Sequence, residues 1–151
     1  MRAVVTRVRD ARVVCGGEIV GEIGQGLLVL LGVGVRDTEE EVRWMADRVV
    51  KLRIFEDGGG KLNLSLPQVG GSVLAVSNFT LYADCSSRRP GFTEAARPER
   101  ARPLYELFLE ECRGAGIHTE AGVFGGDMAV QSVNDGPITI VLDTERRGAA
   151  K

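Results

Sequence analysis

The chain is poor in the side chains that most enzymes use for chemistry. Its 151 residues include one histidine, His118, and three cysteines, Cys15, Cys85 and Cys112, that lie far apart. A single histidine argues against the usual zinc sites and leaves a Ser-His-Asp triad only one imidazole. No two cysteines form a Cys-x-x-Cys pair, and one remains after any pairing, so we expect reduced thiols. We therefore expect neither a metal nor a cofactor.

Long hydrophobic runs are also missing. The longest, residues 27–31 with a glycine-spaced continuation to Val35, is much shorter than the roughly 20 residues that cross a membrane as a helix. The first residues, MRAVVTRVRDARVV, lack the apolar stretch of a signal peptide. A formal net charge of −2 argues against a protein that coats DNA through many phosphate contacts. These absences predict a cytoplasmic protein that binds neither membranes nor DNA.

Glycine is abundant, with 20 residues, about twice its ordinary share. Strand patterns fill residues 1–35, where Gly16-Gly17 is typical of a two-residue hairpin turn. Further strands are predicted at residues 72–81, 117–122, 127–133 and 138–142. A capping box, Thr38 with Glu41, begins one amphipathic helix. A second helix is predicted over residues 98–113.

The order of these elements indicates the fold class. About eight strands, two helices and no regular βαβ alternation predict an α+β domain. Its sheet should be mainly antiparallel and curl towards a barrel. We expect a single domain over residues 1–143, followed by a polar tail at residues 144–151 that frays.

Polar residues interrupt the apolar pattern near the end of the strand predicted at residues 72–81. We call Ser77-Asn78-Phe79-Thr80 the SNFT segment. In a regular strand Asn78 and Thr80 share one face, and Ser77 and Phe79 share the other. Such a strand end can offer hydroxyl, amide and backbone N–H groups to a ligand. The alternative, which the residues alone favour, is a strand end that emerges into solvent.

A second segment, Asn134-Asp135-Gly136-Pro137, lies between two predicted strands. Its composition is typical of a turn, and on sequence alone a turn is the prediction. The alternative is a rigid backbone clamp, in which Gly136 exposes its carbonyl and Pro137 fixes the backbone.

Arginines gather in one irregular stretch. Guanidinium groups bind phosphate through two parallel hydrogen bonds, so a nucleic-acid backbone is a plausible partner. A solvated loop without a ligand is the alternative, and the sequence leaves both open. The cluster consists of Arg88, Arg89, Arg97, Arg100 and Arg102.

Taken together, these segments resemble the bacterial D-aminoacyl-tRNA deacylase family from Met1 to about Asp143. The resemblance rests on many separate stretches in the same order: MRAVVTRV, GEIGQGLLVLLGV, RIFEDGGGKLNLSL, VSNFTLYAD, RRPGF, LYELFLEECR, GVFGGDM and VNDGPITIVLD.

The resemblance implies a homodimer that hydrolyses the ester between a D-amino acid and the 3′-terminal ribose of tRNA. Ser77, Asn78, Phe79 and Thr80 match the family's Ser-Gln-x-Thr active-site motif. Gly136 and Pro137 match its Gly-cis-Pro motif, which reaches into the partner's site and excludes L side chains. The resemblance further implies that achiral glycine passes this filter, so that mischarged glycyl-tRNA is also a substrate.

Arg7 occupies the position whose side chain braces the Gly-cis-Pro motif in the family. The chain departs from the family pattern at Asn78, where Gln is usual, and at Thr6, Gly91 and Gly126. The shorter Asn78 motivates a different hypothesis, a non-catalytic tRNA-binding module. A small-molecule esterase is a third, and it would need no tRNA.

Overall fold

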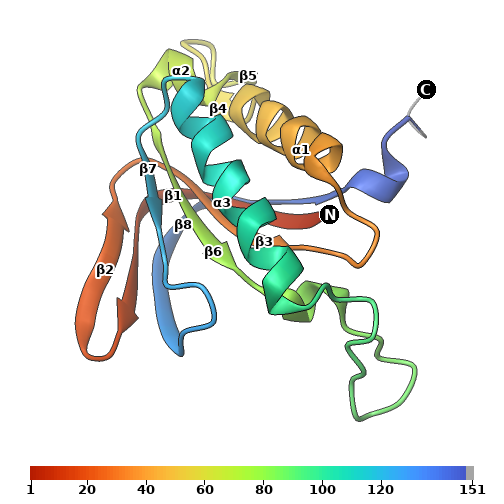
Figure 1. Cartoon of the computed structure of the whole chain (residues 1–151). Coiled ribbons are helices and arrows are strands. Elements are labelled where there is room, and N and C mark those ends of the chain that lie inside the picture. Colours follow the sequence, from red (N-terminus) through yellow and green to blue (C-terminus); the bar gives the residue numbers. More distant parts are fainter. Residues whose placement is uncertain (149–151) are drawn as a thin grey trace.

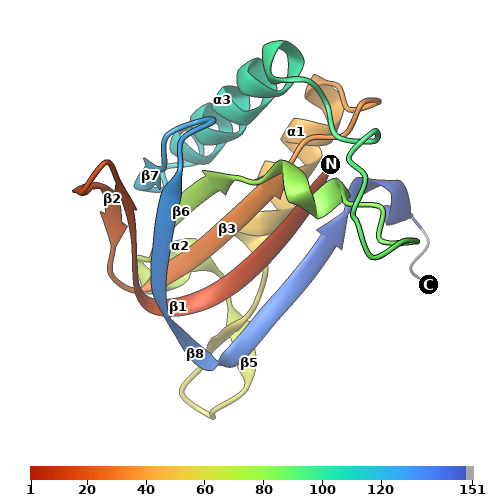
Figure 2. The same cartoon turned by 90° about the horizontal axis from the view of Figure 1, so that it is seen from below.

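The structure, a computed structural model, describes residues 1–148 (Figures 1 and 2). A curved sheet forms one layer and two long helices form the other (Figure 1). Its elements are β1 (Arg2–Cys15), β2 (Glu18–Ile23), β3 (Gly26–Gly32), α1 (Glu39–Lys51), β4 (Phe55–Glu56), β5 (Leu62–Leu64), α2 (Leu66–Val69), β6 (Ser72–Ser77), η1 (Phe79–Tyr82), α3 (Pro98–Gly114), β7 (Thr119–Ala121), β8 (Met128–Asp143) and η2 (Thr144–Arg146), where η denotes a short 3₁₀-helix.

The main sheet has six strands, in the order β2-β1-β3-β6-β7, with β8 paired to β1. The long strand β1 pairs antiparallel with β2, β3 and β8, so it connects the two halves of the curved sheet. The strand β6 pairs parallel with both β3 and β7. The predicted α+β class, with a mainly antiparallel sheet curling towards a barrel, is confirmed (Figure 2).

Both predicted helices form, and both cover the same face of the sheet (Figure 1). The capping box is present at the start of α1, where Thr38 and Glu41 satisfy each other's backbone N–H groups. Pro98 occupies the first turn of α3, where its missing N–H costs no hydrogen bond. A third helix, α2, has a single turn, and a second capping box, Ser65 with Gln68, begins it.

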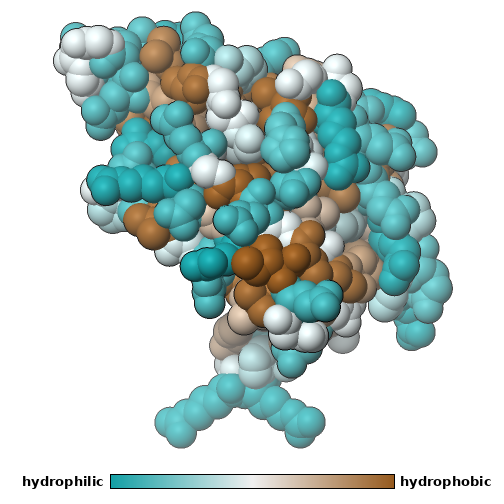
Figure 3. Space-filling view, turned by 90° about the vertical axis from the view of Figure 1, so that its left-hand side faces the viewer, coloured by the Kyte–Doolittle hydropathy of each residue, from teal (hydrophilic) through white to brown (hydrophobic). Residues whose placement is uncertain are grey.

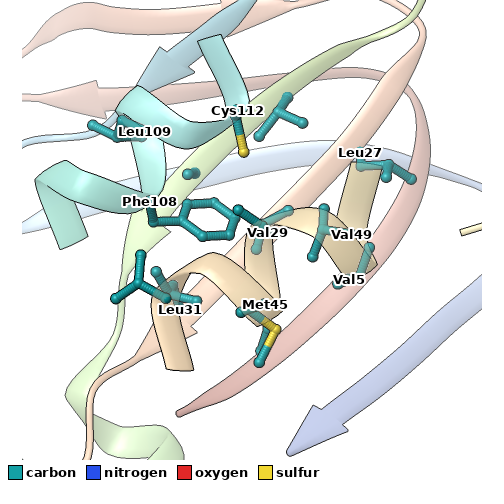
Figure 4. Packing of buried hydrophobic residues seen from close by; sticks show 14 of the residues in the cluster. Val5, Leu27, Val29, Leu31, Met45, Val49, Phe108, Leu109 and Cys112 are labelled. Carbon is teal, nitrogen blue, oxygen red and sulfur yellow. The ribbon is translucent and has the colours of Figure 1, made fainter. Parts of the chain in front are cut away.

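The core lies between the sheet and the helices α1 and α3. Phe108 from α3 and Met45 from α1 are fully buried against Val29 and Leu31 of β3 (Figure 4). Cys112 is buried in the same cluster, and burial raises the pKa of its thiol to about 12. The thiol therefore stays protonated and behaves as a small apolar group.

Two predicted boundaries were wrong. The strand expected over residues 72–81 ends at Ser77, and η1 follows, so Asn78 and Thr80 do not share a strand face. The predicted turn at residues 134–137 is not a chain reversal, because β8 continues through it as a wide bulge. In this bulge the side-chain oxygen of Asn134 accepts from the N–H of Ile138 at 3.1 Å, and β8 bends sharply while both of its parts stay paired with β1 (Figure 2).

The polar tail begins in contact with the body. Thr144 is buried, and its N–H donates to the carbonyl of Met1 at 2.9 Å. Arg147 donates to Glu40 and Glu41 of α1. Residues 144–147 are therefore packed, whereas we expected fraying, and residues 149–151 lie outside the described residues. No helix within residues 1–148 is long and apolar enough to cross a membrane.

Phe108→Ala tests the importance of the core between α3 and the sheet. We expect the free energy of unfolding to fall by about 3–5 kcal/mol, because the substitution leaves a cavity where a fully buried ring stood. Urea unfolding followed by circular dichroism measures the loss. The control, Leu62→Ala at a half-exposed position, should change stability by less than about 1 kcal/mol.

Candidate active site

A pocket of about 1020 Å³ opens beside the carboxyl end of β6. All four residues of the SNFT segment line it. Its other walls come from β3, from the loop before α3 and the first turns of α3, and from the segment that leads into β8. Their lining residues include Leu30, Val33, Phe92, Ala95, Pro98, Ala101, Tyr105, Phe124, Asp127, Met128, Val130 and Ser132.

The position of the SNFT segment follows from the pairing of β6 with β3. Ser77 is in register with Leu31, and the N–H of Asn78 donates to the carbonyl of Leu31 at 2.8 Å. The ladder stops there, and the chain turns into η1. The four polar and aromatic residues therefore end the strand at the rim of the pocket rather than continue the sheet.

Two glycines at the end of β3 allow η1 to lie directly on that strand. A Cβ at Gly32 would approach the carbonyl oxygen of Asn78 to 3.0 Å, and a Cβ at Gly34 would approach the ring of Tyr82 to 2.7 Å. The second distance is shorter than real Cβ contacts, so only glycine fits beside Tyr82 in this arrangement.

The SNFT segment turns polar atoms towards the pocket. The Thr80 hydroxyl donates to the side-chain oxygen of Asn78 at 2.5 Å. Within residues 1–148, the backbone N–H groups of Phe79 and Thr80 have no acceptor, as expected for the first residues of a helix. Phe79 is 57% exposed, and its ring packs edge-on against Phe92 with 5.1 Å between the ring centroids.

Sequence reasoning missed the residues, Arg2 and Asp37, that contact η1. The guanidinium of Arg2 donates to the carbonyl of Leu81 at 3.1 Å and lies over the ring of Tyr82. The Tyr82 hydroxyl reaches the buried carboxylate of Asp37. Burial, reinforced by that carboxylate, raises the pKa of Tyr82 well above its usual range, so its hydroxyl remains a donor. The spacing Gly32-x-Gly34 at a strand end is the one signal in the sequence that could have indicated this packing.

The pocket offers little acid–base chemistry. Tyr105 donates to the carbonyl of Ala75 at 2.7 Å, and burial raises its pKa to about 12. It is therefore a neutral part of the wall. His118 is 67% exposed and does not line the pocket. Asp127 is the one carboxylate among the lining residues within 1–148, and Thr80 has no base beside it.

Gly136 and Pro137 lie elsewhere. They are exposed on the bulge of β8, where one residue of β1, Arg7, faces the four residues 135–138 of β8. Gly136 has φ of +134°, a conformation that other residues rarely adopt, and the Gly136–Pro137 peptide bond is cis. A Cβ at Gly136 would also approach the N–H nitrogen of Ile138 to 3.0 Å.

Arg7 supports this bulge. It is 5% exposed, and its guanidinium donates to the carbonyl of Asp135 at 3.0 Å and to that of Ile54 at 2.9 Å. The carboxylates of Asp135 and Glu56 lie 3.6 and 3.9 Å away and balance its buried charge. Because its two donors are directed at carbonyls from different segments, Arg7 fixes the backbone just before Gly136.

The two predicted sites do not meet within one chain. Ser77 pairs with Leu31 of β3, and Leu31 pairs with Ala3 of β1. The bulge of β8 lies opposite Arg7 of β1. Ala3 and Arg7 are four residues apart on β1, which is about 13 Å along the strand. Neither Gly136 nor Pro137 lines the pocket that holds the SNFT segment.

Comparison with known proteins identifies the family. The family model described as D-Tyr-tRNA(Tyr) deacylase matches residues 4–143. The chain belongs to this family. The D-aminoacyl-tRNA deacylase of Symbiobacterium thermophilum is 54% identical over 147 residues, and the match covers 97% of each chain. That of Thermus aquaticus is 50% identical over 148 residues, which is 97% of each chain.

Two solved structures are similar to this chain in fold. The c-Myc DNA unwinding element binding protein aligns with a TM-score of 0.90 and 39% identity, covering 95% of this chain and 99% of its own. A probable eukaryotic D-amino acid tRNA deacylase aligns with a TM-score of 0.81 at 18% identity, covering 93% and 97%. The second likeness shows the fold alone.

Gly34→Ala tests the glycine contact beneath η1. We expect the methyl group to push Tyr82 and the SNFT segment away from β3, lowering stability by about 1–3 kcal/mol. Amide hydrogen exchange should show faster exchange in residues 78–83 than in the wild type.

The matched control is Gly58→Ala, because a Cβ at Gly58 meets nothing within 4 Å. Unchanged exchange in residues 78–83 of the Gly34→Ala variant would contradict the role given to this contact.

Proposed function

We propose that this protein hydrolyses the ester bond between a D-amino acid and the 3′-terminal ribose of tRNA. The observation that carries the proposal is the SNFT segment at the rim of a large pocket in a chain of the deacylase family. The relatives from Symbiobacterium thermophilum and Thermus aquaticus are named for this activity. The substrate is made where tRNA is charged, which supports a cytoplasmic location.

The pocket chemistry suits an ester that is already activated. Water adds to the ester carbonyl carbon, the bond to the ribose oxygen breaks, and that oxygen leaves with a proton. The free N–H groups of Phe79 and Thr80 can stabilise the negative charge that develops on the carbonyl oxygen. The neighbouring 2′-hydroxyl of the ribose can assist the water. Thr80 positions groups rather than attacking, because its proton is directed at Asn78 and no base lies beside it.

Selection against L-amino acids requires a second element, and Gly136 with Pro137 is the candidate. Backbone carbonyls can hold the α-amino group of the substrate in one orientation, which leaves no room for a side chain of L configuration. Glycine has no side chain to exclude, so glycyl-tRNA is also a substrate. The buried guanidinium of Arg7 supplies the rigidity that such a filter needs.

A homodimer brings the two elements together. Gly136 and Pro137 are exposed and distant from the pocket of their own chain, yet β8 lines that pocket four to six residues earlier, with Val130 and Ser132. A two-fold contact that includes β8 therefore brings the partner's Gly136 to the pocket. Exposed apolar side chains on β8, Val130, Val133 and Val141, support such a contact. Figure 3 shows a patch of apolar side chains on the face of the molecule that is turned to the viewer.

The activity is tested by incubating the protein with D-tyrosyl-tRNA and with L-tyrosyl-tRNA. We expect release of tyrosine from the D substrate and little from the L substrate. Binding of both without release would favour the alternative function, a non-catalytic tRNA-binding module suggested by Asn78. Hydrolysis of simple esters with no preference for tRNA would favour an esterase.

Gly136→Ala tests the chiral filter. A residue with a side chain rarely adopts φ of +134°, and its Cβ would crowd Ile138, so the bulge must change shape. We expect the ratio of D- to L-tyrosyl-tRNA hydrolysis to fall by on the order of tenfold or more, about 1.4 kcal/mol of discrimination. Initial rates on both substrates measure it.

The matched control is Gly116→Ala, another glycine with positive φ, +82°, which has open space around it. It should lose some stability and keep its selectivity. A Gly136→Ala protein with unchanged selectivity would refute the role of the motif in chiral discrimination.

A further inference from the structure

The loop that joins η1 to α3, residues 83–97, projects from the body of the molecule (Figure 1). We call it the arginine loop. Three of its residues line the pocket. We propose that Arg88, Arg89 and Arg97 on this loop bind phosphate groups of the tRNA that precede its 3′-terminal nucleotide. The proposal rests on the proposed function and assigns to it the surface that holds the nucleic acid.

The root of the arginine loop is part of the pocket. Phe92, Ala95 and Ala96 line the pocket, and Phe92 packs against Phe79 of the SNFT segment. Two backbone hydrogen bonds join the root to the segment that follows β3. The N–H of Val35 donates to the backbone carbonyl of Glu94 at 3.0 Å, and the N–H of Ala96 donates to that of Val33 at 2.9 Å. When the 3′ end of a tRNA occupies the pocket, the nucleotides that precede it therefore lie next to this loop.

The tip of the loop has a defined shape. Asp84 and Gly91 exchange two backbone hydrogen bonds, of 2.8 and 2.9 Å, which close a small hairpin. Inside it, the carboxylate of Asp84 accepts from the N–H of Ser86, and the Ser87 hydroxyl donates to the carbonyl of Arg89. The hydrogen bond from Ser86 lowers the pKa of Asp84. The carboxylate thus remains bound at the base of the hairpin, while Arg88 and Arg89 occupy its tip.

Within residues 1–148, no carboxylate neutralises the charges of these arginines. Arg88, Arg89 and Arg97 are exposed, and within residues 1–148 none has a carboxylate within 4.0 Å. The neighbouring arginines are engaged: Arg100 donates to the carbonyl of Asp37, and Arg102 lies over the ring of Phe124. Figure 3 shows that the part of the molecule at the bottom of the view ends in hydrophilic side chains.

A local patch is what this protein needs to hold a polyanion. Its net charge of −2 repels tRNA on average, so attraction must come from a few cations placed near the reacting end. Unpaired guanidinium groups make bidentate hydrogen bonds to phosphate and release counterions, which gives binding that weakens as salt rises. An acidic protein partner could bind the same charges. The proposed substrate of the adjacent pocket, however, is itself a polyanion, and this favours tRNA.

The test compares Arg88→Gln/Arg89→Gln with the wild type on D-tyrosyl-tRNA at about 50 mM and about 200 mM KCl. We expect KM to rise on the order of tenfold at the lower salt, with kcat within about twofold, because the arginines bind parts of the substrate remote from the reacting bond. The slope of log KM against log salt should become shallower by about 1 for each lost phosphate contact.

The matched control is Arg43→Gln/Arg48→Gln, which removes two exposed charges from α1. It should behave as the wild type. D-tyrosyl-adenosine, which has no phosphates, should be hydrolysed equally by the wild type and the loop variant. An unchanged KM and salt slope for the loop variant, or an equal loss on D-tyrosyl-adenosine, would overturn the proposal.

Filter binding of uncharged tRNA separates this proposal from the proposed function. If the wild type hydrolyses neither substrate, the proposed function fails, while the tRNA affinity still tests the arginines. Weaker, less salt-dependent binding by the loop variant would then support the phosphate-binding role. Equal binding by the loop variant and the wild type would overturn it.

Discussion

The contact between η1 and the glycine-bearing end of β3 is the constraint on which the pocket depends. The strand β6 runs parallel to β3 only as far as Ser77, and the chain must then leave the sheet without losing contact with it. Gly32 and Gly34 provide the space, because a side chain at either would meet the backbone or ring of η1. The free N–H groups, the Thr80 hydroxyl and the exposed ring of Phe79 are then held at one edge of the pocket.

Charge is distributed in a way that fits a substrate with a polar end and a long anionic body. The pocket itself is mostly apolar and contains few ionisable groups. Two arginines support the architecture: the buried Arg7 contacts the bulge of β8, and the partly buried Arg2 contacts η1 through the carbonyl of Leu81. Arg88, Arg89 and Arg97, which have no carboxylate within 4.0 Å among residues 1–148, lie on the arginine loop outside the pocket. Because the lining contains few ionisable groups, few charges compete with the ester for the N–H donors.

Local patterns were reliable where one interaction dominates. The capping box at Thr38 and the apolar spacing after it determine α1 before any tertiary contact forms, and Pro98 marks the start of α3 in the same way. The four residues of the SNFT segment were also predicted as a site from their motif. The continuation of the strand through Asn78 to Leu81 was wrong, because β-propensity does not register the glycines opposite. The turn expected at Asn134 to Pro137 was wrong because β8 pairs antiparallel with β1 on both sides of these residues, a long-range contact that the local composition does not reveal.

The sequence by itself determined the class of fold, the two long helices, the family and the identity of the candidate site residues. These depend on periodicity, capping and motifs, which are properties of neighbouring residues. Only the tertiary structure decided where the site residues lie relative to one another. It placed the SNFT segment in the pocket and put Gly136 and Pro137 about 13 Å away along the strands. It also left Arg88, Arg89 and Arg97 without a carboxylate partner among the described residues 1–148. These placements depend on the register of β1 with β3 and β8, which is set by packing between residues far apart in the chain.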